Sequence, residues 1–393
     1  MSTLRVDNIR HNSATSDAIT TATDGTCTAR ITGMTGGGGL SHRNAIVNGA
    51  MNVAQRGTQS TGNTTAGYTT VDRFQLALSA AGTWTTDQSS VTDLAGFSKA
   101  FKVTCTTANG DGSNLSNSAG ILACQYRAEG QDIQGFHKGF PSAKQYALSF
   151  YVKSNKTGTY VVEVLDVDNS RHICKSYTVS SASTWEKKTL ILDADTTGKF
   201  DNDNNHSLQL RWYLAAGTNF TSGTLATSWA SNTGANKAVG NVNLAQATSN
   251  FWEITGVQLE VGDTATSFEH RSFADELARC QRYYYQVGPL QTDVFGQGRT
   301  DNDNLNMLVL IHYPVTMRSS PATLTTTGSA GNYDVRRDTT KGCSAVPTIH
   351  TTSSIHLAQV ICQSNSHGWG TASPMQLQAD GGGTAFLGFS AEL

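Results

Sequence analysis

Residues 251–285 contain, one after the other, both of the hydrophobic periods that a folded chain can use. The first part of this stretch alternates apolar and polar side chains, as a β-strand does. Trp252 and Val257 nevertheless have opposite parities, so we expect a one-residue slip near Thr255 and Gly256 that brings both side chains to one face. After the turn that follows, the period changes from two to about 3.6, which predicts a helix.

We predict one connecting helix, over residues 272–287. Ser272 has the position of an N-cap, and Asp275 follows it at the spacing of a capping box. A narrow apolar stripe runs along this helix and comprises Phe273, Leu277, Cys280 and Tyr284. The stripe is too narrow for a buried core helix, so it packs either on its own sandwich or against neighbouring chains of an oligomer, and we favour a seam with neighbouring chains.

The rest of the chain has the composition of an all-β protein. Charged residues make up 15% of it, glycine outnumbers proline 38 to 6, and small polar residues separate short apolar alternations. We predict a jelly-roll β-sandwich of about eight to ten antiparallel strands over residues 41–271, and a second, smaller β domain over 288–393. Residues 207–214 alternate most regularly, which predicts a sheet buried on one face.

Residues 1–40 are interpreted as a separate N-terminal segment. Its short extended pieces hold too little apolar surface for a core, so we expect them to pair with other chains. The glycine run at 36–39 lacks the frame of a phosphate-binding loop and is interpreted as a flexible linker. The polar stretch 214–250 is long for a loop in a compact domain, which is typical of functional or mobile loops.

Several classes of partner and cofactor are not expected. The net charge of −2 and the lack of a basic stripe argue against nucleic acid, and no apolar run approaches the roughly 20 residues of a membrane span. The seven cysteines show no metal-ligand spacing and are interpreted as small buried apolar residues. The acidic-amide runs 201–205 and 301–304 lack the glycine and glutamate of a calcium loop, so we favour turns, with a structural calcium as the alternative.

No catalytic frame is present, and we expect a protein without enzymatic activity. The sequence contains no nucleophile elbow, no metalloprotease helix motif and no defensible pairing of cysteine with histidine. The ten histidines are scattered, and isolated histidines are more often surface or hydrogen-bonded residues than bases or ligands.

Three tryptophans are candidates for glycan binding. Trp84 lies in a polar Thr/Ser strand, whereas Trp229 and Trp369 lie in loops rich in small polar residues. An exposed aromatic ring stacks on the apolar face of a sugar, while neighbouring amides and carboxylates bond its hydroxyls. The alternative is that these rings anchor loops to the body of the domain. The other tryptophans alternate within strands and are interpreted as core residues: Trp185, Trp212 and Trp252.

Five longer stretches resemble a known family. They are AIVNGAMNVAQRGT at 45–58, VDRF at 71–74, LSFYVKSNKTGTYVVEV at 148–164, STWEKKTL at 183–190 and EITGVQLEVGDTATSFEHRSFADELARCQRYYY at 253–285. Together they resemble tailed-bacteriophage structural proteins of the tail-fibre and carbohydrate-binding-module-like type, and the opening MSTLRVDNI and the ending FSAEL are similar to the termini of such fibres. Ser267 stands where the family commonly has proline. The matched motifs concern the scaffold and the hinge, so the resemblance transfers no ligand site.

The resemblance implies a virion appendage, often trimeric, with a jelly roll like that of carbohydrate-binding modules. We therefore expect a homotrimeric tail fibre, made in the host cytoplasm and located on the virion, that contacts other tail proteins through its N-terminal segment and a host surface glycan through its body. The alternative is a structural neck, tail or capsid-decoration protein that binds virion proteins without recognising a receptor. A glycan-depolymerising tailspike is disfavoured, because its usual parallel β-helix would show a fixed sequence repeat.

Overall fold

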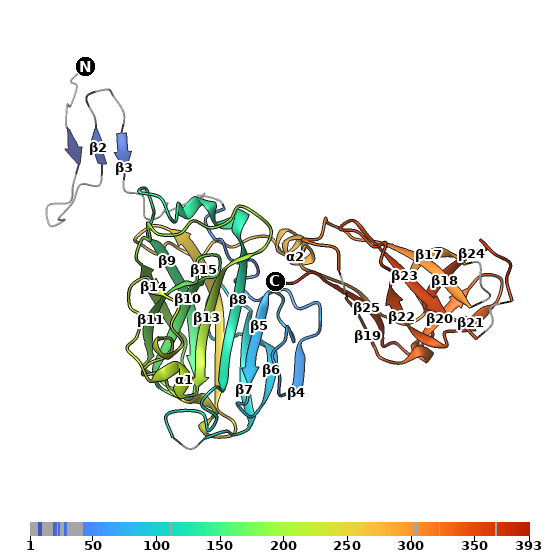
Figure 1. The fold of residues 1–393 in the computed structure, drawn as a ribbon, viewed down its shortest axis with the longest axis horizontal. Helices are drawn as coiled ribbons and strands as arrows, with labels where there is room; N and C mark the ends of the chain where they lie inside the picture. The colour runs from blue at the N-terminus through green and yellow to red at the C-terminus, as the bar shows by residue number, and fades with distance from the viewer. Residues whose placement is uncertain are drawn as a thin grey trace.

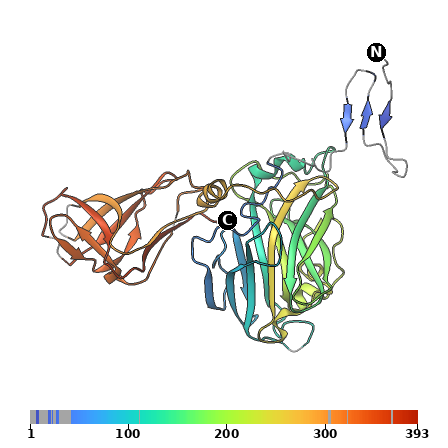
Figure 2. The same cartoon turned by 180° about the vertical axis from the view of Figure 1, so that it is seen from behind.

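The protein consists of a large β-sandwich and a smaller C-terminal β unit (Figures 1 and 2). The structure is a computed structural model, and it describes residues 7–9, 19–21, 23, 27–29, 42–110, 112–301, 305–321, 323–365 and 368–393. Helix α2 (Phe273–Gln281) lies between the sandwich and the C-terminal unit in both views. None of the helices in these described ranges is long and apolar enough to cross a membrane.

Two six-stranded antiparallel sheets form the sandwich and enclose its core. Sheet 1 contains, in spatial order, β14 (Ala230–Ser231), β11 (Arg171–Val179), β10 (Gly158–Asp166), β13 (His206–Ala216), β8 (Ile121–Glu129) and β5 (Phe74–Ser79). Sheet 2 contains β12 (Glu186–Leu192), β9 (Tyr146–Ser154), β15 (Phe251–Val261), β7 (Lys99–Thr107), β6 (Thr83–Ser90) and β4 (Gln59–Asn63). The predicted all-β jelly-roll sandwich is confirmed. Trp212 and Trp252 have no exposed surface, as predicted for core residues.

The slip predicted in the last sandwich strand is present in β15. Its pairing with β9 shifts between Thr255 and Gln258, and Gly256 at the shift has a φ of +62°. This β-bulge reverses the parity of the side chains that follow it. Trp252 and Val257 therefore both lie in the core with no exposed surface.

Replacing Gly256 by alanine is expected to disturb this bulge. A β-carbon at this position would lie 2.8 Å from Cζ of Phe97 and 2.9 Å from Cδ2 of Tyr151, and the positive φ is strained for alanine. We expect the free energy of unfolding, measured by urea denaturation, to fall by about 1–3 kcal/mol. Gly112→Ala is the control, because a β-carbon there meets no atom within 4 Å. Equal stability of both variants would show that the bulge does not require glycine.

The outer face of sheet 1 is covered, which the alternation at 207–214 did not indicate. The apolar parity faces the core as predicted, but Gln209 and Tyr213 on the opposite parity are only 3% and 0% exposed. The cover is the stretch 217–250, which packs Phe220 against Tyr213. It contains short helices and one short strand: α1 (Thr218–Thr221), β14, η2 (Gly234–Asn236) and η3 (Leu244–Gln246). This long polar stretch is thus a structural element of the sandwich.

Helix α2 begins as predicted and ends earlier. The Ser272 hydroxyl accepts a hydrogen bond from the main-chain N–H of Asp275 at 3.2 Å, which confirms Ser272 as the N-cap. The helix ends at Gln281 instead of at residue 287, because the chain from Tyr284 onward pairs with the strand β25 (Ala385–Ser390).

The apolar stripe of this region is divided between the chain itself and the surface. Cys280 has no exposed surface and packs against Val47 of the sandwich, with Leu277 partly buried beside it. Tyr284 is 2% exposed, whereas Phe273 is 59% exposed. The single chain therefore already buries Cys280 and Tyr284, and Phe273 is the member of the proposed seam that a neighbouring chain could reach. The seam itself stays a prediction.

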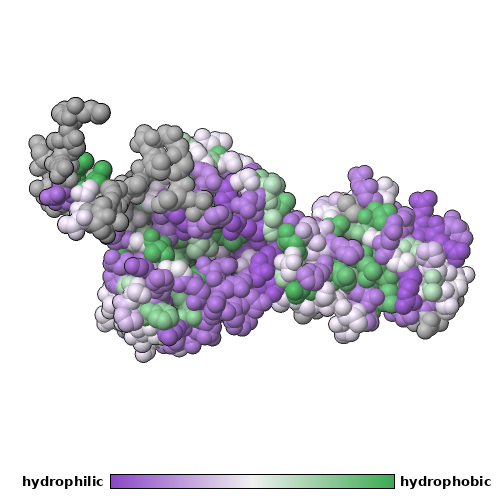
Figure 3. All heavy atoms as spheres, turned by 90° about the horizontal axis from the view of Figure 1, so that it is seen from above, coloured by the Kyte–Doolittle hydropathy of each residue, from purple (hydrophilic) through white to green (hydrophobic). Residues whose placement is uncertain are grey.

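A seven-stranded sheet and a three-stranded sheet form the C-terminal unit around its own core. The larger sheet contains β21 (Thr340–Gly342), β20 (Tyr333–Arg336), β24 (Pro374–Ala379), β17 (Val294–Thr300), β18 (Asn306–His312), β23 (Leu357–Gln363) and β22 (Ala345–Ile349). The smaller sheet contains β16 (Tyr284–Leu290), β25 (Ala385–Ser390) and β19 (Thr323–Thr326), and the short helix η4 (Ala330–Asn332) precedes β20. Figure 3 shows apolar patches on this unit, and its exposed apolar side chains include Val294, Leu305 and Leu310.

The described N-terminal residues form three short antiparallel strands, β1 (Asn8–Ile9), β2 (Ile19–Thr21) and β3 (Cys27–Ala29). Ile9 is 52% exposed, as expected for a segment without a core. The glycine run at 36–39 and the side chain of Cys27 lie outside the described part of the chain. The other cysteines are free and buried, which confirms their interpretation as apolar residues: Cys105, Cys124, Cys174, Cys280, Cys343 and Cys362.

Candidate ligand-binding surface

A buried ionic network lies on the outer face of sheet 1, beneath the cover 217–250. Glu163 of β10 has no exposed surface. Its carboxylate accepts a hydrogen bond from the Tyr213 hydroxyl at 3.0 Å and lies 2.9 Å from Nζ of Lys237 and 3.1 Å from Nδ1 of His172. Because Lys237 belongs to the cover, this network ties the cover to the sheet.

Charge pairing keeps Glu163 ionised in spite of its burial. Burial raises the pKa of this carboxyl, but the hydrogen bond with His172 and the charges of Lys237 and Arg211 have the larger combined effect and lower the pKa to about 2. The same burial raises the pKa of the neighbouring Cys174 thiol, so this thiol is a poor nucleophile. We therefore interpret the network as structural.

Trp84 is a core residue, and its prediction as a glycan-binding residue is wrong. It has no exposed surface, and its Nε1 donates a hydrogen bond to the main-chain oxygen of Ala81 at 2.8 Å. Side chains alternate along a strand, so Thr83 and Thr85 point outward while the tryptophan between them reaches the core. The polar neighbours of Trp84 were therefore no sign of exposure.

Trp229 and Trp369 are both packed against the protein body. Trp229 donates a hydrogen bond to the main-chain oxygen of Asp193 at 2.7 Å and packs partly buried against the sandwich core. Nζ of Lys138 lies 5.0 Å from the centre of its ring. Trp369 packs partly buried against the core of the C-terminal unit. The three predicted tryptophans thus lie in three separate places and form no common surface.

A different group of aromatic residues lies on the outer side of sheet 2. We call it the aromatic strip, and its members are Phe97, Tyr151, Trp185, Phe268 and His270. The ring of Phe97 is central, with centroids 5.2 Å from Tyr151, 5.1 Å from Phe268 and 5.3 Å from His270. Tyr151 points away from the core, because its neighbours along β9 are core residues. His270 is exposed and the other four side chains are half-buried.

Trp185 lies at the polar end of the strip, so its interpretation as a core residue is wrong. It directly precedes β12 and is half-buried. Its Nε1 donates a hydrogen bond to Oδ1 of Asp93 at 2.9 Å, and Nζ of Lys153 lies 2.8 Å from Oδ2 of the same carboxylate. The hydrogen bond from Lys153 lowers the pKa of Asp93, which stays ionised at neutral pH. Tyr151 and Lys153 share the outward parity of β9, so the rings and the charged groups adjoin.

This arrangement matches the chemistry of sugar binding. Half-exposed aromatic faces accept the apolar face of a sugar ring. A carboxylate accepts hydrogen bonds from hydroxyl groups and an ammonium donates to them. The strip is assembled from loop 91–98, strand β9, Trp185 before β12 and the segment 266–271, and it lies on an outer sheet face rather than in a closed pocket.

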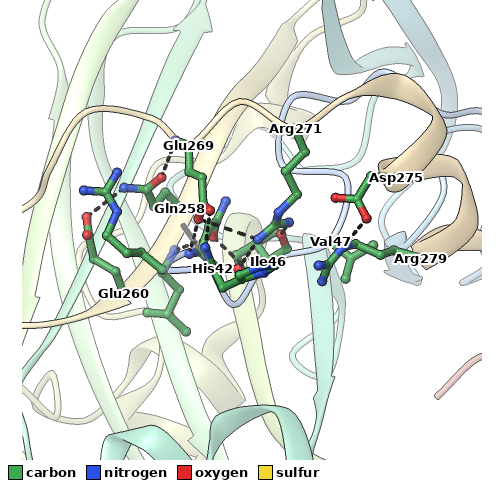
Figure 4. Close-up of polar contacts among 12 residues, drawn as sticks. His42, Ile46, Val47, Gln258, Glu260, Glu269, Arg271, Asp275 and Arg279 are labelled. Atoms are coloured by element: carbon green, nitrogen blue, oxygen red, sulfur yellow. Dashed lines mark hydrogen bonds and ion pairs between the residues drawn. The ribbon is translucent and has the colours of Figure 1, made fainter. Parts of the chain in front are cut away.

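The segment 266–271 connects the strip to residues 42–47, which we call the N-terminal strap (Figure 4). Its two aromatic residues belong to the strip, whereas Glu269 and Arg271 have the opposite parity and face the strap. The carboxylate of Glu269 accepts hydrogen bonds from two main-chain N–H groups of the strap, and the guanidinium of Arg271 donates to two of its main-chain oxygens. Beneath the segment, Oε1 of Gln258 accepts a hydrogen bond from the main chain of Glu269 at 2.8 Å. These hydrogen bonds hold the segment 266–271, and with it the Phe268 and His270 rings of the strip, in place.

Three of the motifs that carry the family resemblance meet at the junction between the sandwich, α2 and the C-terminal unit: VDRF, the stretch 253–285 and the terminal FSAEL. Arg73 of the VDRF motif has no exposed surface. Its guanidinium pairs with the carboxylate of Glu392, donates to the main-chain oxygen of Arg127 at 2.6 Å and lies 3.4 Å from the centre of the Tyr283 ring. Residues from three distant motifs thus join the two units.

A second arginine strengthens the same junction. Arg56 lies 3.3 Å from Glu392 and 3.5 Å from the centre of the Tyr284 ring. Asp72 lies 3.7 Å from Arg56 but is completely buried, and burial raises its pKa to about 6 although Arg56 opposes the shift. These residues orient the C-terminal unit, so the motifs belong to the scaffold.

The acidic-amide run 201–205 forms turns, as predicted. Oδ1 of Asp203 accepts a hydrogen bond from the main chain of Asn205 at 2.9 Å, and Asp168 binds the main chain of Asp201 in the same way. Residues 302–304 of the second run lie outside the described residues. Within the described ranges, no group of three or more His, Cys, Asp or Glu residues is placed to hold a metal ion.

The fold and its surfaces define a two-unit all-β protein, a jelly-roll sandwich with an aromatic outer face joined to a smaller β unit. No protein-family model and no curated protein matches the chain. The tailspike protein 4 enzymatically active domain of bacteriophage CBA120 has a TM-score of 0.29 and 11% identity over 56% of this chain and 21% of that chain. The match spans about a fifth of the length of that tailspike chain.

Two carbohydrate-related structures are similar at the same low level. The family 11 carbohydrate-binding module of a cellulosomal cellulase from Clostridium thermocellum has a TM-score of 0.22 and 12% identity, over 54% of this chain and 91% of that chain. A putative sugar binding protein from Bacteroides thetaiotaomicron has a TM-score of 0.26 and 15% identity, over 56% of this chain and 100% of that chain. Similarities this weak give no inference about the ligand of this chain.

Proposed function

We propose that this protein is a bacteriophage tail fibre that attaches to a glycan of the host surface through the aromatic strip. The observation that supports glycan binding is the strip itself: half-exposed rings beside an ionised carboxylate and an ammonium, on an open sheet face. The placement on a virion is supported by the resemblance of the junction motifs to tail-fibre proteins. The protein acts by binding, without enzymatic activity.

The rings of the strip and the charged side chains beside them have distinct roles in this proposal. Trp185 and Tyr151 offer ring faces on which sugar units stack. Asp93, whose side chain is 53% exposed, accepts hydrogen bonds from hydroxyl groups, and Lys153 donates to them. Because the surface lies on an outer sheet face rather than in a closed pocket, it suits several units of a polysaccharide better than one small molecule.

Polysaccharide binding by the full-length chain tests this proposal. Wild-type protein, Trp185→Ala and Tyr151→Ala are measured by biolayer interferometry on a panel of immobilised bacterial lipopolysaccharides and capsular polysaccharides. We expect each variant to bind the recognised polysaccharide about tenfold more weakly, a loss of about 1.4 kcal/mol. Phe140→Ala is the matched control, because Phe140 is an exposed aromatic residue outside the strip and is expected to bind like wild type.

A structural virion protein is the second candidate function. It is favoured by the exposed apolar side chains of the C-terminal unit, which suit a protein partner. Wild-type protein that binds no polysaccharide and no host cells, but that associates with purified virions of the same phage, would contradict the proposal and support this alternative. Gold-labelled antibody on intact virions then locates the chain.

We propose a homotrimer as the state in which the fibre acts. The short N-terminal strands cannot form a core alone, and Ile9 and Phe273 are 52% and 59% exposed in the single chain. Light scattering on the full-length chain is expected to give three times the monomer mass of 41.8 kDa. Phe273→Asp is expected to shift this equilibrium toward monomers, and a monodisperse wild-type monomer would contradict the proposal.

A further inference from the structure

A cleft with a volume of about 240 Å³ lies against the N-terminal strap, apart from the aromatic strip. It is lined by residues of the strap, by residues of η1 (Gly130–Phe136) and by Arg279 of α2. Figure 4 shows Arg271 above the strap and Arg279 to the right of it, beside Val47. None of the predicted glycan-binding residues lines this cleft.

The cleft has an apolar floor and a polar rim. Ile133 and Phe136 line it and are 1% and 3% exposed, so they form its inner wall. Arg43, Arg279 and Asp132 line it with charged side chains that can both donate and accept hydrogen bonds. An apolar wall combined with a few polar groups at the rim is the usual composition of a small-molecule site.

Two of the cleft's three arginines are already neutralised. Arg271 lies 3.8 Å from Glu269 and 3.6 Å from Glu276, and Arg279 lies 3.3 Å from Asp275. Their charges therefore give the cleft no excess of positive potential, and a strongly anionic ligand is not favoured.

Arg43 and Asp132 balance each other as the remaining charged groups. Within the described residues neither forms an ion pair, although the main-chain oxygen of Ser267 accepts a hydrogen bond from Arg43 at 3.3 Å. Burial and the negative charge of Glu129 raise the pKa of Asp132, although Asp132 is an exposed residue that solvent reaches. In addition, Nε of Arg271 is buried without a hydrogen-bond partner in the described part of the chain, on a side chain that is 6% exposed.

We propose that this cleft binds one neutral, polyhydroxylated ring, a single sugar residue. The balanced charge selects a neutral ligand, and the pairing of a carboxylate with guanidinium groups suits neighbouring hydroxyls, which need both an acceptor and a donor. Val261, which lines the cleft and is 46% exposed, contacts the apolar face of the ring. The volume lies below the roughly 300–1,000 Å³ of drug-sized sites, which fits one ring rather than a chain. The site is independent of the strip, so it does not rest on the function proposed above.

Methyl NMR on the full-length chain tests this site. Protein labelled at Ile, Leu and Val methyl groups is titrated separately with methyl glycosides of glucose, galactose, mannose and N-acetylglucosamine, and with glycerol as an open-chain polyol. For at least one glycoside we expect saturable shifts of the methyl signals of Ile133, Val47 and Val261, which line the cleft. The signals of Leu308 in the C-terminal unit should not move. Glycerol should give no saturable shift.

Variants make the outcome specific. Asp132→Asn combined with Arg43→Gln is expected to weaken the binding about a hundredfold or more, because each lost hydrogen bond to a charged group corresponds to about tenfold or more. Asp263→Asn, an exposed acid outside the cleft, should leave it unchanged. The same spectra show whether each variant is folded. Three results would overturn the proposal: no saturable shift with any glycoside, equal shifts with glycerol, or unchanged affinity in the folded double variant.

The strip variants separate this inference from the proposed function. Tyr151→Ala should keep the glycoside-induced shifts while losing polysaccharide binding. If wild-type protein binds no polysaccharide but shows the shifts, the cleft is a sugar site and the fibre proposal is wrong. If Tyr151→Ala abolishes the shifts as well, the cleft is not a separate site and the inference fails. If the ligand of the cleft is the terminal sugar of a polysaccharide, oligosaccharide fragments of the recognised polymer should cause the same methyl shifts.

Discussion

Replacing Glu163 by leucine is expected to lower the free energy of unfolding of the sandwich by about 3–5 kcal/mol. The substitution leaves Lys237 and His172 buried without an acid and removes the acceptor of the Tyr213 hydroxyl. Removing one partner of a buried ionic network is costly, because the charge that remains, here that of Lys237, stays desolvated without its counter-ion. Urea denaturation followed by tryptophan fluorescence measures the effect, since all tryptophans except Trp369 lie in the sandwich.

Glu186→Leu is the matched control for this substitution. Glu186 pairs with Lys188 at 2.5 Å, but both side chains are partly exposed, at 18% and 16%. The Glu186 carboxylate also accepts hydrogen bonds from the main-chain N–H groups of Ser180 and Ser181 at 2.8 Å, so its loss is expected to cost about 1–2 kcal/mol. Glu163→Gln should fall between the two, because it keeps the shape and loses the charge. A Glu163→Leu protein as stable as wild type would show that the buried network does not stabilise the sandwich.

The same carboxylate predicts a dependence of stability on pH. Its pKa is about 2 in the folded protein, against a usual value of 4.5. An acid with a lowered pKa stabilises the fold fully above its usual pKa, and this contribution is lost as the pH falls from about 4.5 to about 2. Relative to Glu163→Gln, wild type should lose about 3 kcal/mol across this window. Parallel pH profiles of the two proteins would contradict this assignment.

Replacing Arg73 by methionine is expected to uncouple the sandwich from the C-terminal unit. The substitution leaves Glu392 with Arg56 as its partner and removes the cation that lies 3.4 Å from the Tyr283 ring. We expect the junction to lose about 3–5 kcal/mol, so that the two units unfold in separate thermal transitions. Differential scanning calorimetry measures the transitions, and small-angle X-ray scattering measures the widened range of distances between the units.

Arg171→Met provides the comparison for Arg73. Arg171 also pairs with a carboxylate, Asp195 at 2.8 Å, but it lies on β11 of sheet 1 and away from the junction. It should lower stability without separating the transitions. If Arg73→Met shows the same unfolding profile and the same scattering as Arg171→Met, the coupling does not depend on Arg73.

Local features of the fold could be predicted from the sequence, and features that depend on distant contacts could not. The bulge at Gly256 follows from the parity of its near neighbours, and the start of α2 follows from Ser272 and Asp275. The cover of sheet 1 depends on contacts such as that of Lys237 with Glu163, which join separate parts of the chain. Its polar composition gives no periodic signal, so the sequence pattern indicated only a long loop.

The aromatic strip was missed for the same reason. Its rings come from four separate segments, and three of these segments meet around Phe97. Two predictions from strand position were wrong. Trp84 lies among polar residues but reaches the core, whereas Trp185 precedes its strand and stays half-exposed. One local signal was available: Phe268 and His270 share a parity directly after a turn, which places both rings on one side of an extended segment.

The two chain connections of the C-terminal unit have a mechanical consequence. The chain leaves the sandwich through α2 and returns to it after β25, where the main-chain N–H of Ala391 donates to the oxygen of Tyr283 at 2.7 Å. Arg318 donates to the oxygen of Ala391, also at 2.7 Å. A body attached at two neighbouring points cannot swivel about either one, so a twist applied to its far end loads both attachments together. A sideways force on the far end of the C-terminal unit would therefore act on the sandwich as a torque at these two attachments.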